Sequence, residues 1–297
     1  MKGKWISHIF LFGAALIYGA NYSIAKIILD DDYISPMGLV LLRVVTAAIV
    51  FFLFHSIFIK EKIKKQDYIS FLLVALLGVV INQSCFIIGL KYTVPINAAL
   101  IMTVVPIIVF IFSSFLLNEK ISNKKILGVS FGFIGVLIII LKRGSFVLSV
   151  DTLKGDFLVF VNSVSYALYL VKVKPLLKRY NPVTITKWMF LFGLIFIFPI
   201  GISGVLNVNF SGFTPEIWSS LGYVLLFTTV LAYLFNILGL KNVNPSVVAI
   251  YIYLQPILAT IVALLLGKDS LDFIKTLAAL LIFTGVYLVS VHKVIKI

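Results

Sequence analysis

The sequence predicts an all-α integral membrane protein whose ten transmembrane helices form two inverted five-helix repeats. Composition places the chain in a membrane, since hydrophobic residues are 61% of its 297 positions, charged residues are 12%, and the mean hydropathy is +1.14. Soluble domains are about 45–50% apolar and about 25% charged. A long internal repeat predicts the division into two halves.

The repeat relates two stretches of the chain that lie 150 positions apart. The stretch from Gly89 to Val136 returns between Gly239 and Val286 without a gap. The matched positions are Gly89-Leu90-Lys91 with Gly239-Leu240-Lys241, Pro95 with Pro245, Pro106-Ile107 with Pro256-Ile257, Lys125 with Lys275, and Gly135-Val136 with Gly285-Val286. Short solenoid units run to about 50 residues. This longer repeat therefore indicates a duplicated half-protein.

The first predicted span runs from Ile6 to about Ile28, after Lys2 and Lys4. Basic residues ahead of an apolar run imitate a secretory signal peptide, but this run is too long. A bilayer core of about 30 Å needs roughly 20 helical residues, so the run is predicted to cross it. Nine further spans are predicted at 36–59, 68–90, 94–117, 125–141, 156–173, 183–204, 216–239, 244–266 and 276–292.

Lysines and arginines between the spans predict the orientation. With the N-terminus in the cytoplasm, sixteen of them fall on the cytoplasmic side and six on the outer side. Cytoplasmic loops carry this excess in membrane proteins, so both termini are predicted to be cytoplasmic, in a multi-pass protein of the cell membrane. Five spans per half is an odd number, which inverts the second half. The predicted domains are a first repeat at 1–141, an outward-facing linker at 142–153 and a second repeat at 154–297.

The net charge of +14 does not indicate nucleic-acid binding. Nucleic-acid binders gather basic residues on a soluble face, whereas these lysines sit in short gaps between apolar spans. The single cysteine, Cys85, lies inside an apolar span and excludes disulfides and cysteine metal sites. We expect the lipid bilayer and a small-molecule substrate as partners, and neither a metal nor a cofactor.

Four short motifs lie on the first, second and fifth predicted spans and in the loop before the fifth. They are Tyr18-Gly-Ala-Asn-Tyr-Ser23, Leu42-Arg43, Glu119-Lys120, and the glycine-spaced stretch from Gly128 to Gly135. Together they resemble the first, second and fifth helices and the glutamate loop of the EamA family, in the drug/metabolite transporter superfamily. The second half departs from that pattern, because Asp269 replaces the glutamate and Leu277-Ala278-Ala279 replaces the first glycine. The resemblance covers essentially the whole chain.

The resemblance implies a transporter, not an enzyme, that exports or exchanges small metabolites, amino acids among them. An importer or an antiporter of nucleotide-linked sugars is the alternative among transporters. A receptor or scaffold that transports nothing is the alternative from another class. An intramembrane hydrolase would need a base beside Ser203 of Gly201-Ile-Ser203-Gly204, and no histidine shares its depth.

Polar side chains at membrane depth mark the candidate substrate site. Such residues are costly in a bilayer and usually face a cavity or the bundle interior. They form stripes at helical spacing on several predicted spans, and this favours a central cavity over isolated interhelical hydrogen bonds. The candidate substrate-binding residues are Tyr18, Asn21, Arg43, Asn82, Gln83, Asn162, Tyr166, Tyr169, Tyr233, Tyr251 and Gln255.

Three basic residues of the predicted spans, Lys26, Arg43 and Lys187, belong to neither the cytoplasmic nor the outer set. Arg43 is the best candidate to hold an anionic substrate group, because its planar guanidinium binds carboxylates in a bidentate manner and stays charged. Lys26 and Lys187 lie near span ends, where a flexible lysine readily extends to the interface. We expect both to do so.

Pro106 and Pro256 occupy equivalent positions near the middle of the fourth and ninth predicted spans. Each removes a backbone donor and kinks its helix. They are candidate hinges or gates, and a fixed bend is the alternative. On the fifth span, Gly128, Gly132 and Gly135 share one face, which predicts close helix packing or, alternatively, a homodimer contact.

The acidic residues and histidines are predicted to lie in loops or near helix ends. Proton relays in transporters commonly use buried Asp, Glu or His. Coupling through a central titratable residue therefore has no support in the sequence, and facilitated export or exchange is the simpler hypothesis.

Overall fold

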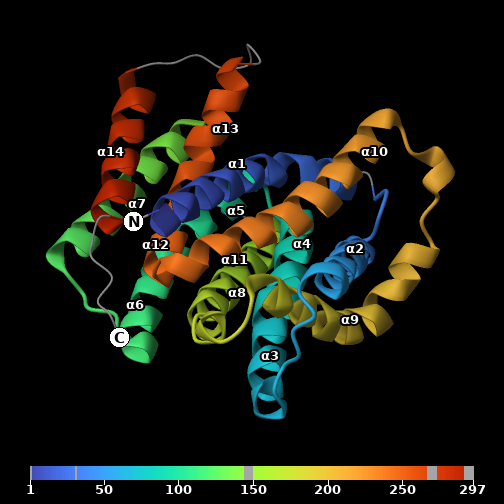
Figure 1. Ribbon diagram of the computed structural model, residues 1–297. Helices are drawn as coiled ribbons and strands as arrows, with labels where there is room; N and C mark the ends of the chain where they lie inside the picture. Colours follow the sequence, from blue (N-terminus) through green and yellow to red (C-terminus); the bar gives the residue numbers. More distant parts are fainter. Residues whose placement is uncertain (1, 31, 144–149, 266–272, 291–297) are drawn as a thin grey trace.

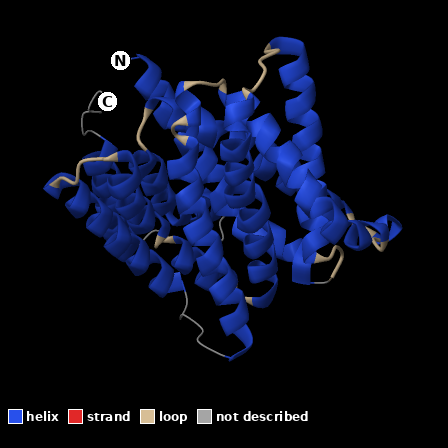
Figure 2. Cartoon of the chain, turned by 90° about the horizontal axis from the view of Figure 1, so that it is seen from below, coloured by secondary structure: helices blue, strands red, loops and turns tan. Residues whose placement is uncertain are grey.

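The structure, a computed structural model, describes the chain except residues 1, 31, 144–149, 266–272 and 291–297. Its secondary structure within these described residues is entirely helical (Figure 2). Nine of the described helical segments are long and apolar enough to cross a membrane, and a tenth, Pro245–Ile261, is shorter. The predicted ten-helix membrane fold is confirmed.

The first repeat contains five spans, two of which are divided into shorter elements (Figure 1). They are α1 (Lys2–Asp30), α2 (Pro36–Phe58), a third span of α3 (Tyr68–Ala75), a π-helical segment (Leu76–Ile81) and α4 (Asn82–Tyr92), a fourth span of α5 (Pro95–Met102) and α6 (Val105–Leu117), and α7 (Asn123–Arg143).

The second repeat divides its spans in the same places. They are α8 (Val150–Val173), α9 (Pro182–Leu206), an eighth span of α10 (Pro215–Gly222), a π-helical segment (Tyr223–Leu231) and α11 (Ala232–Asn242), a ninth span of α12 (Pro245–Ile250), a 3-10 turn (Tyr251–Tyr253) and α13 (Leu254–Leu265), and α14 (Phe273–Ser290).

Several helices begin with the same local chemistry. α2, α9 and α10 start with a proline that follows a capping residue, and the caps are Ser35, Asn181 and Thr214. Each capping side chain accepts a hydrogen bond from a backbone N–H of the first turn. Proline fits the first turn because its missing N–H would have no intrahelical partner there. These signals explain why the predicted starts of these spans fall within about one residue of the observed ones.

Corresponding helices of the two repeats pack against each other. α2 lies along α9, and α7 lies along α14. Glycines permit both contacts, because a Cβ added to Gly38 would lie 2.7 Å from the Gly204 carbonyl oxygen, and one added to Gly128 would lie 2.8 Å from that of Gly285. The predicted packing role of the α7 glycines is confirmed, and α14 covers them. A homodimer stays a prediction.

First and third spans pack across the repeats. α1 of the first repeat lies along α11 of the second, and α8 of the second lies along α4 of the first. At the second contact a Cβ on Gly155 would lie 2.7 Å from the Gly89 carbonyl oxygen. These four helices therefore surround the centre of the molecule, and each repeat contributes two of them.

The fourth and ninth spans are interrupted next to their prolines. Thr103 and Val104 separate α5 from α6, and the 3-10 turn separates α12 from α13. Pro106 and Pro256 lie in the first turns after these breaks. At both places a turn of 3-10 type replaces the regular α-helix beside the prolines that were predicted to disturb it. The matching π-helical segments of the third and eighth spans were not predicted, since a widened turn changes no residue type and leaves no compositional signal.

Candidate functional site

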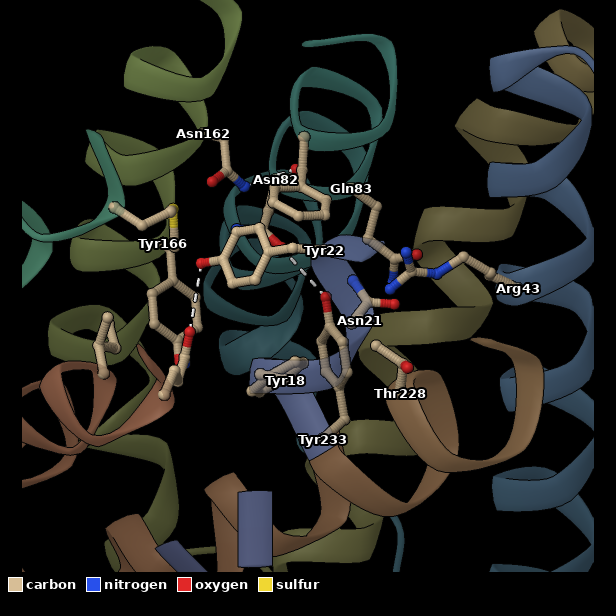
Figure 3. A pocket seen from close by; sticks show the side chains of 14 residues that line it. Tyr18, Asn21, Tyr22, Arg43, Asn82, Gln83, Asn162, Tyr166, Thr228 and Tyr233 are labelled. Carbon is tan, nitrogen blue, oxygen red and sulfur yellow. Dashed lines mark hydrogen bonds between the residues drawn. The ribbon is translucent and has the colours of Figure 1, made fainter. Parts of the chain in front are cut away.

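A cavity lies between the two repeats and encloses about 580 Å³ of empty space, part of which is open solvent (Figure 3). Nine of the eleven candidate residues line it: Tyr18, Asn21, Arg43, Asn82, Gln83, Asn162, Tyr166, Tyr233 and Gln255. The predicted convergence of polar side chains from distant spans is what the structure shows.

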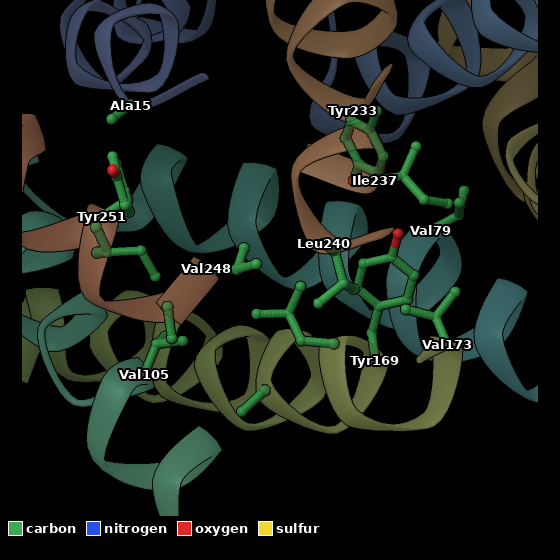
Figure 4. Close-up of a cluster of buried hydrophobic side chains, with 14 of the residues drawn as sticks. Ala15, Val79, Val105, Tyr169, Val173, Tyr233, Ile237, Leu240, Val248 and Tyr251 are labelled. Atoms are coloured by element: carbon green, nitrogen blue, oxygen red, sulfur yellow. The ribbon is translucent and has the colours of Figure 1, made fainter. Parts of the chain in front are cut away.

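Tyr169 is not among the residues that line the cavity, although it was predicted with them, and it belongs to the buried cluster shown in Figure 4. It is 2% exposed, and a Cβ added to Gly78 would lie 2.6 Å from its ring. Tyr169 lies three positions after Tyr166, about 60° away around a helix of 3.6 residues per turn, and their ring centres are 6.0 Å apart. That offset places the Tyr169 ring against Gly78 of the π-helical segment.

Tyr251 also lies outside the cavity lining. Its hydroxyl is 2.7 Å from Nδ1 of His8, near the start of α1. In a regular helix Tyr251 and Gln255 would share one face, being four residues apart. The 3-10 turn over Tyr251–Tyr253 breaks that register, so only Gln255 reaches the cavity.

Arg43 provides the cavity with a buried positive charge. Its side chain is 3% exposed, and Nε donates a hydrogen bond to Thr229 Oγ1 at 2.9 Å. Thr229 in turn donates to the Val224 carbonyl oxygen, five residues earlier in the π-helical segment, at 2.7 Å. The widened turn thus holds the threonine that orients the guanidinium. Within the described part of the chain, Nη1 of Arg43 has no hydrogen-bond partner.

Five other buried polar atoms of the cavity lining have no hydrogen-bond partner among the described residues: Asn21 Oδ1, Gln83 Oε1, Gln83 Nε2, Asn162 Oδ1 and Thr228 Oγ1. Figure 3 shows Asn21 and Gln83 near the Arg43 guanidinium. Buried polar atoms without partners are costly, and each needs an explanation such as a ligand or water. In the described residues the lining contains no Asp, Glu or His, so the Arg43 charge has no acidic counterpart there.

Other polar side chains fix the cavity wall. Asn162 Nδ2 donates to the Asn82 carbonyl oxygen at 2.8 Å, and Tyr233 Oη donates to the Gly78 carbonyl oxygen at 3.0 Å. Ser165, three positions after Asn162 on α8, donates to the Leu77 carbonyl oxygen at 2.7 Å. Leu77 and Gly78 belong to the π-helical segment of the third span, and Asn82 directly follows that segment. Interhelical bonding and cavity lining are thus combined in Asn162 and Tyr233.

Five residues of the lining were not predicted: Tyr22, Phe86, Met102, Thr228 and Ile252. Tyr22 lies four residues after Tyr18, so both side chains lie on the same face of α1. That spacing could have identified Tyr22. The apolar members carry no signal that distinguishes them from lipid-facing or core positions.

Lys187 is held by side chains of α2 and α9, and its extension to the membrane interface stays a prediction. The residue is 8% exposed, its ammonium group lies 3.3 Å from His55 Nδ1, and it lies 4.9 Å from the centre of the Trp188 ring. Histidine and the aromatic face replace the contacts that water would give. The ammonium group is therefore retained between α2 and α9.

Lys26 and Lys174 each bind carbonyl oxygens at the C-terminal end of the third span of their own repeat. Lys26 Nζ donates to the carbonyl oxygens of Leu90, Lys91 and Thr93 at 2.9, 3.1 and 3.0 Å. Lys174 Nζ donates to those of Leu240, Lys241 and Val243 at 2.6, 3.1 and 2.7 Å. A cation is favourable at a helix C-terminus, where carbonyls lack intrahelical partners. The extension of Lys26 to the membrane interface stays a prediction.

Two segments of the chain, residues 5–141 and residues 153–291, each match the EamA-like transporter family. The chain belongs to this family. The resemblance noted in the sequence is confirmed, and the protein is a membrane transporter, not an enzyme.

Relatives of the EamA-like protein extend over nearly its whole length. The uncharacterized transporter YyaM of Bacillus subtilis is 27% identical over 94% of this chain and 92% of its own. An uncharacterized transporter of Archaeoglobus fulgidus is 28% identical over 97% of this chain and 98% of its own. One crystal structure of another protein superposes with a TM-score of 0.75, at 16% identity, covering 96% of this chain and 97% of that one. This last similarity shows the fold alone.

Glu119 ties the two repeats of the EamA-like protein together at one end of the bundle. Its Oε1 accepts from Lys125 Nζ at 2.6 Å and from Asn244 Nδ2 at 3.2 Å, and its Oε2 accepts from Ser246 Oγ at 3.0 Å. The Glu119 and Lys125 side chains are only 7% and 6% exposed. Asn244 and Ser246 flank the start of α12, so this cluster joins the end of α6 to the beginning of the ninth span.

Proposed function

We propose that the protein is a secondary transporter that moves a small metabolite bearing a carboxylate, an amino acid or a related compound, across the cytoplasmic membrane by alternating access. The proposed direction is export or exchange, with both termini in the cytoplasm. The observation that carries this proposal is the Arg43 guanidinium, which lines a tyrosine-rich cavity. Nη1 of this guanidinium has no hydrogen-bond acceptor among the described residues.

The surroundings of Arg43 support a carboxylate ligand. Guanidinium groups bind carboxylates through paired N–H donors, and such bonds are stronger than neutral ones. Asn21 Oδ1 and Asn162 Oδ1 are unpaired acceptors that suit an ammonium or hydroxyl group of the same substrate. Tyr18, Tyr166 and Phe86 supply aromatic surface for an apolar body. A monocarboxylate with an aromatic or aliphatic side chain satisfies all three kinds of group.

Two features of the fold support alternating access. The fourth and ninth spans are interrupted at equivalent places beside the cavity, and interrupted helices in inverted repeats are a recurring arrangement in secondary transporters. Pro106 and Pro256 then serve as hinges at these breaks. The Glu119 cluster closes one end of the bundle, which the lysine distribution predicts to be cytoplasmic.

The alternative of a nucleotide-linked sugar fits the cavity less well. A diphosphate carries two negative charges, and Arg43 is the one cation in the described lining. Exchange without proton coupling is favoured because the same lining has no carboxylate or imidazole. Asp156 is buried, but its carboxylate accepts hydrogen bonds from Asn97 at 3.1 and 3.2 Å outside the cavity lining.

The proposal is tested with four compounds that share one phenyl body: phenylalanine, phenylalaninamide, phenethylamine and 3-phenylpropionate. Ligand binding to the folded state raises thermal stability. We expect the two carboxylates, phenylalanine and phenylpropionate, to raise the Tm of the purified protein and to drive counterflow in proteoliposomes. The amide and the amine should do neither. Equal effects of acid and amide would refute the role of Arg43.

A further inference from the structure

A second cavity, about 700 Å³ of empty space that includes open solvent, adjoins the first. The two cavities share three residues, Tyr22, Ile252 and Gln255. The second cavity is also lined by Ser23, which is exposed, and by Thr103. The three shared residues form a thin partition between the cavities. Arg43 lies on one side of this partition, and the second cavity lies on the other.

The partition is closed by one hydrogen bond. Tyr22 Oη donates to Gln255 Oε1 at 3.2 Å (Figure 3 shows this bond as a dashed line at Tyr22). Tyr22 and Gln255 are 9% and 6% exposed. Behind them α1 approaches α13 closely, because a Cβ added to Gly19 would lie 2.8 Å from the Gln255 carbonyl oxygen. The backbones therefore hold the two side chains against each other.

The second cavity lies toward the end of the bundle opposite the Glu119 cluster. Pro95, at the start of α5, and Ile140, near the end of α7, both line it. The Glu119 cluster lies at the other ends of these spans, after α6 and before α7. The Glu119 cluster thus joins the two repeats at one end of the bundle, and the second cavity lies toward the other end. The lysine distribution predicts that the end with the cavity faces out.

Both helix breaks border the partition. Gln255 directly precedes Pro256 in the first turn of α13, after the 3-10 turn. Thr103 lies in the break between α5 and α6. A rotation at either break moves one wall of the second cavity, and a rotation at the ninth span moves Gln255 away from Tyr22. Hinges of this kind concentrate the change at a few element ends.

We infer that Tyr22 and Gln255 form a gate, and that the second cavity is the vestibule through which substrate reaches Arg43. This inference rests on the proposed transport function. Opening needs only the loss of one hydrogen bond between neutral groups, whose typical net contribution corresponds to about fivefold in an equilibrium. The gate therefore opens by thermal fluctuation, and substrate passes from the vestibule into the central cavity.

Cysteine labelling of the full-length purified protein tests the gate. In a Cys85→Ala background, Ser23→Cys reports on the vestibule and Thr228→Cys reports on the central cavity. A small hydrophilic methanethiosulfonate is the probe, and mass spectrometry gives the labelling rate. We expect Tyr22→Phe, which removes only the hydroxyl, to accelerate labelling at position 228 about fivefold. Labelling at position 23 should not change.

A matched control removes a different tyrosine hydroxyl. Tyr223→Phe also deletes a hydrogen bond to α1, from Tyr223 Oη to the Ile17 carbonyl oxygen at 2.7 Å, but Tyr223 is not at the partition. It should leave labelling at position 228 unchanged. Gln255→Leu should reproduce the effect of Tyr22→Phe, and the double variant should add nothing further, because both break the same bond.

Two outcomes overturn the gate: equal labelling of position 228 with and without the Tyr22 hydroxyl, or acceleration by Tyr223→Phe as large as by Tyr22→Phe. Labelling needs no substrate and no transport. A failed gate therefore leaves the carboxylate test standing, and a failed carboxylate test leaves the labelling result interpretable.

Discussion

Loss of the Glu119 carboxylate charge should release the end of the bundle that it now closes. The Glu119–Lys125 pair is nearly excluded from solvent, with N–O contact at 2.6 Å, and Glu119 also accepts from Asn244 and Ser246. Removing one partner of a buried ion pair costs about 3–5 kcal/mol, because the other charge stays buried. Opening this end hydrates Lys125 and relieves that cost. The closed conformation of Glu119→Gln should therefore lose about 3 kcal/mol, a shift of about 100-fold in the opening equilibrium.

Hydrogen exchange measured by mass spectrometry of the purified protein detects this opening. Segments at the end of α6 and in α12 should exchange faster in Glu119→Gln, while α2 and α9 should keep wild-type protection. Glu216→Gln is the charge-matched control, since Glu216 is exposed at the start of α10. Glu119→Leu combined with Lys125→Met removes both charges and should restore protection. Unchanged exchange in α6 and α12 of a folded Glu119→Gln protein would refute this reasoning.

The remaining predictions concern transport and stability. Arg43→Lys should weaken binding of a carboxylate substrate about tenfold, because it loses the bidentate contact. Lys187→Arg should change the binding affinity by no more than about twofold. Equal losses in proteoliposome counterflow would contradict a substrate role for Arg43. Counterflow should proceed without a pH gradient, and a protonophore should leave its initial rate nearly unchanged, because the described cavity lining has no acidic or imidazole group; accumulation that depends on proton flow would disprove this. Lys174→Met should lower the free energy of unfolding by about 2 kcal/mol, since three helix-end carbonyls lose their donor; an unchanged Tm would show that water replaces the ammonium group.

The sequence predicted the spans well because length, hydropathy and N-terminal prolines act locally. It also placed nine cavity residues correctly, because polar side chains such as Asn21 and Gln83 are too costly to face lipid. Its errors came from geometry that residue types do not encode. Tyr251 was misplaced by a 3-10 turn, and Tyr169 by a rotation of part of a turn.

The three basic residues show the same limit in electrostatics. Depth and flexibility alone suggested that Lys26 and Lys187 extend to the interface, but they did not identify the hydrogen-bond partners of these lysines, which are distant in sequence. Lys187 lies beside His55, 132 positions away, and Lys26 binds carbonyls at the end of α4. Arg43 lines the cavity, as expected for a guanidinium that cannot discharge, and its role in holding a substrate anion stays a prediction.

The hydrogen bonds of Lys26 and Lys174, together with two helix contacts, join four helices around the cavity into a closed ring. α1 packs on α11, Lys174 fastens the end of α11 beside α8, α8 packs on α4, and Lys26 fastens the end of α4 back to α1. Two of the four junctions in this ring are held by three hydrogen bonds each. We therefore expect the width of the cavity to stay constant while the fourth and ninth spans move relative to these four helices. Substitutions in the ring should change which molecules fit, whereas substitutions at the breaks should change how fast they pass.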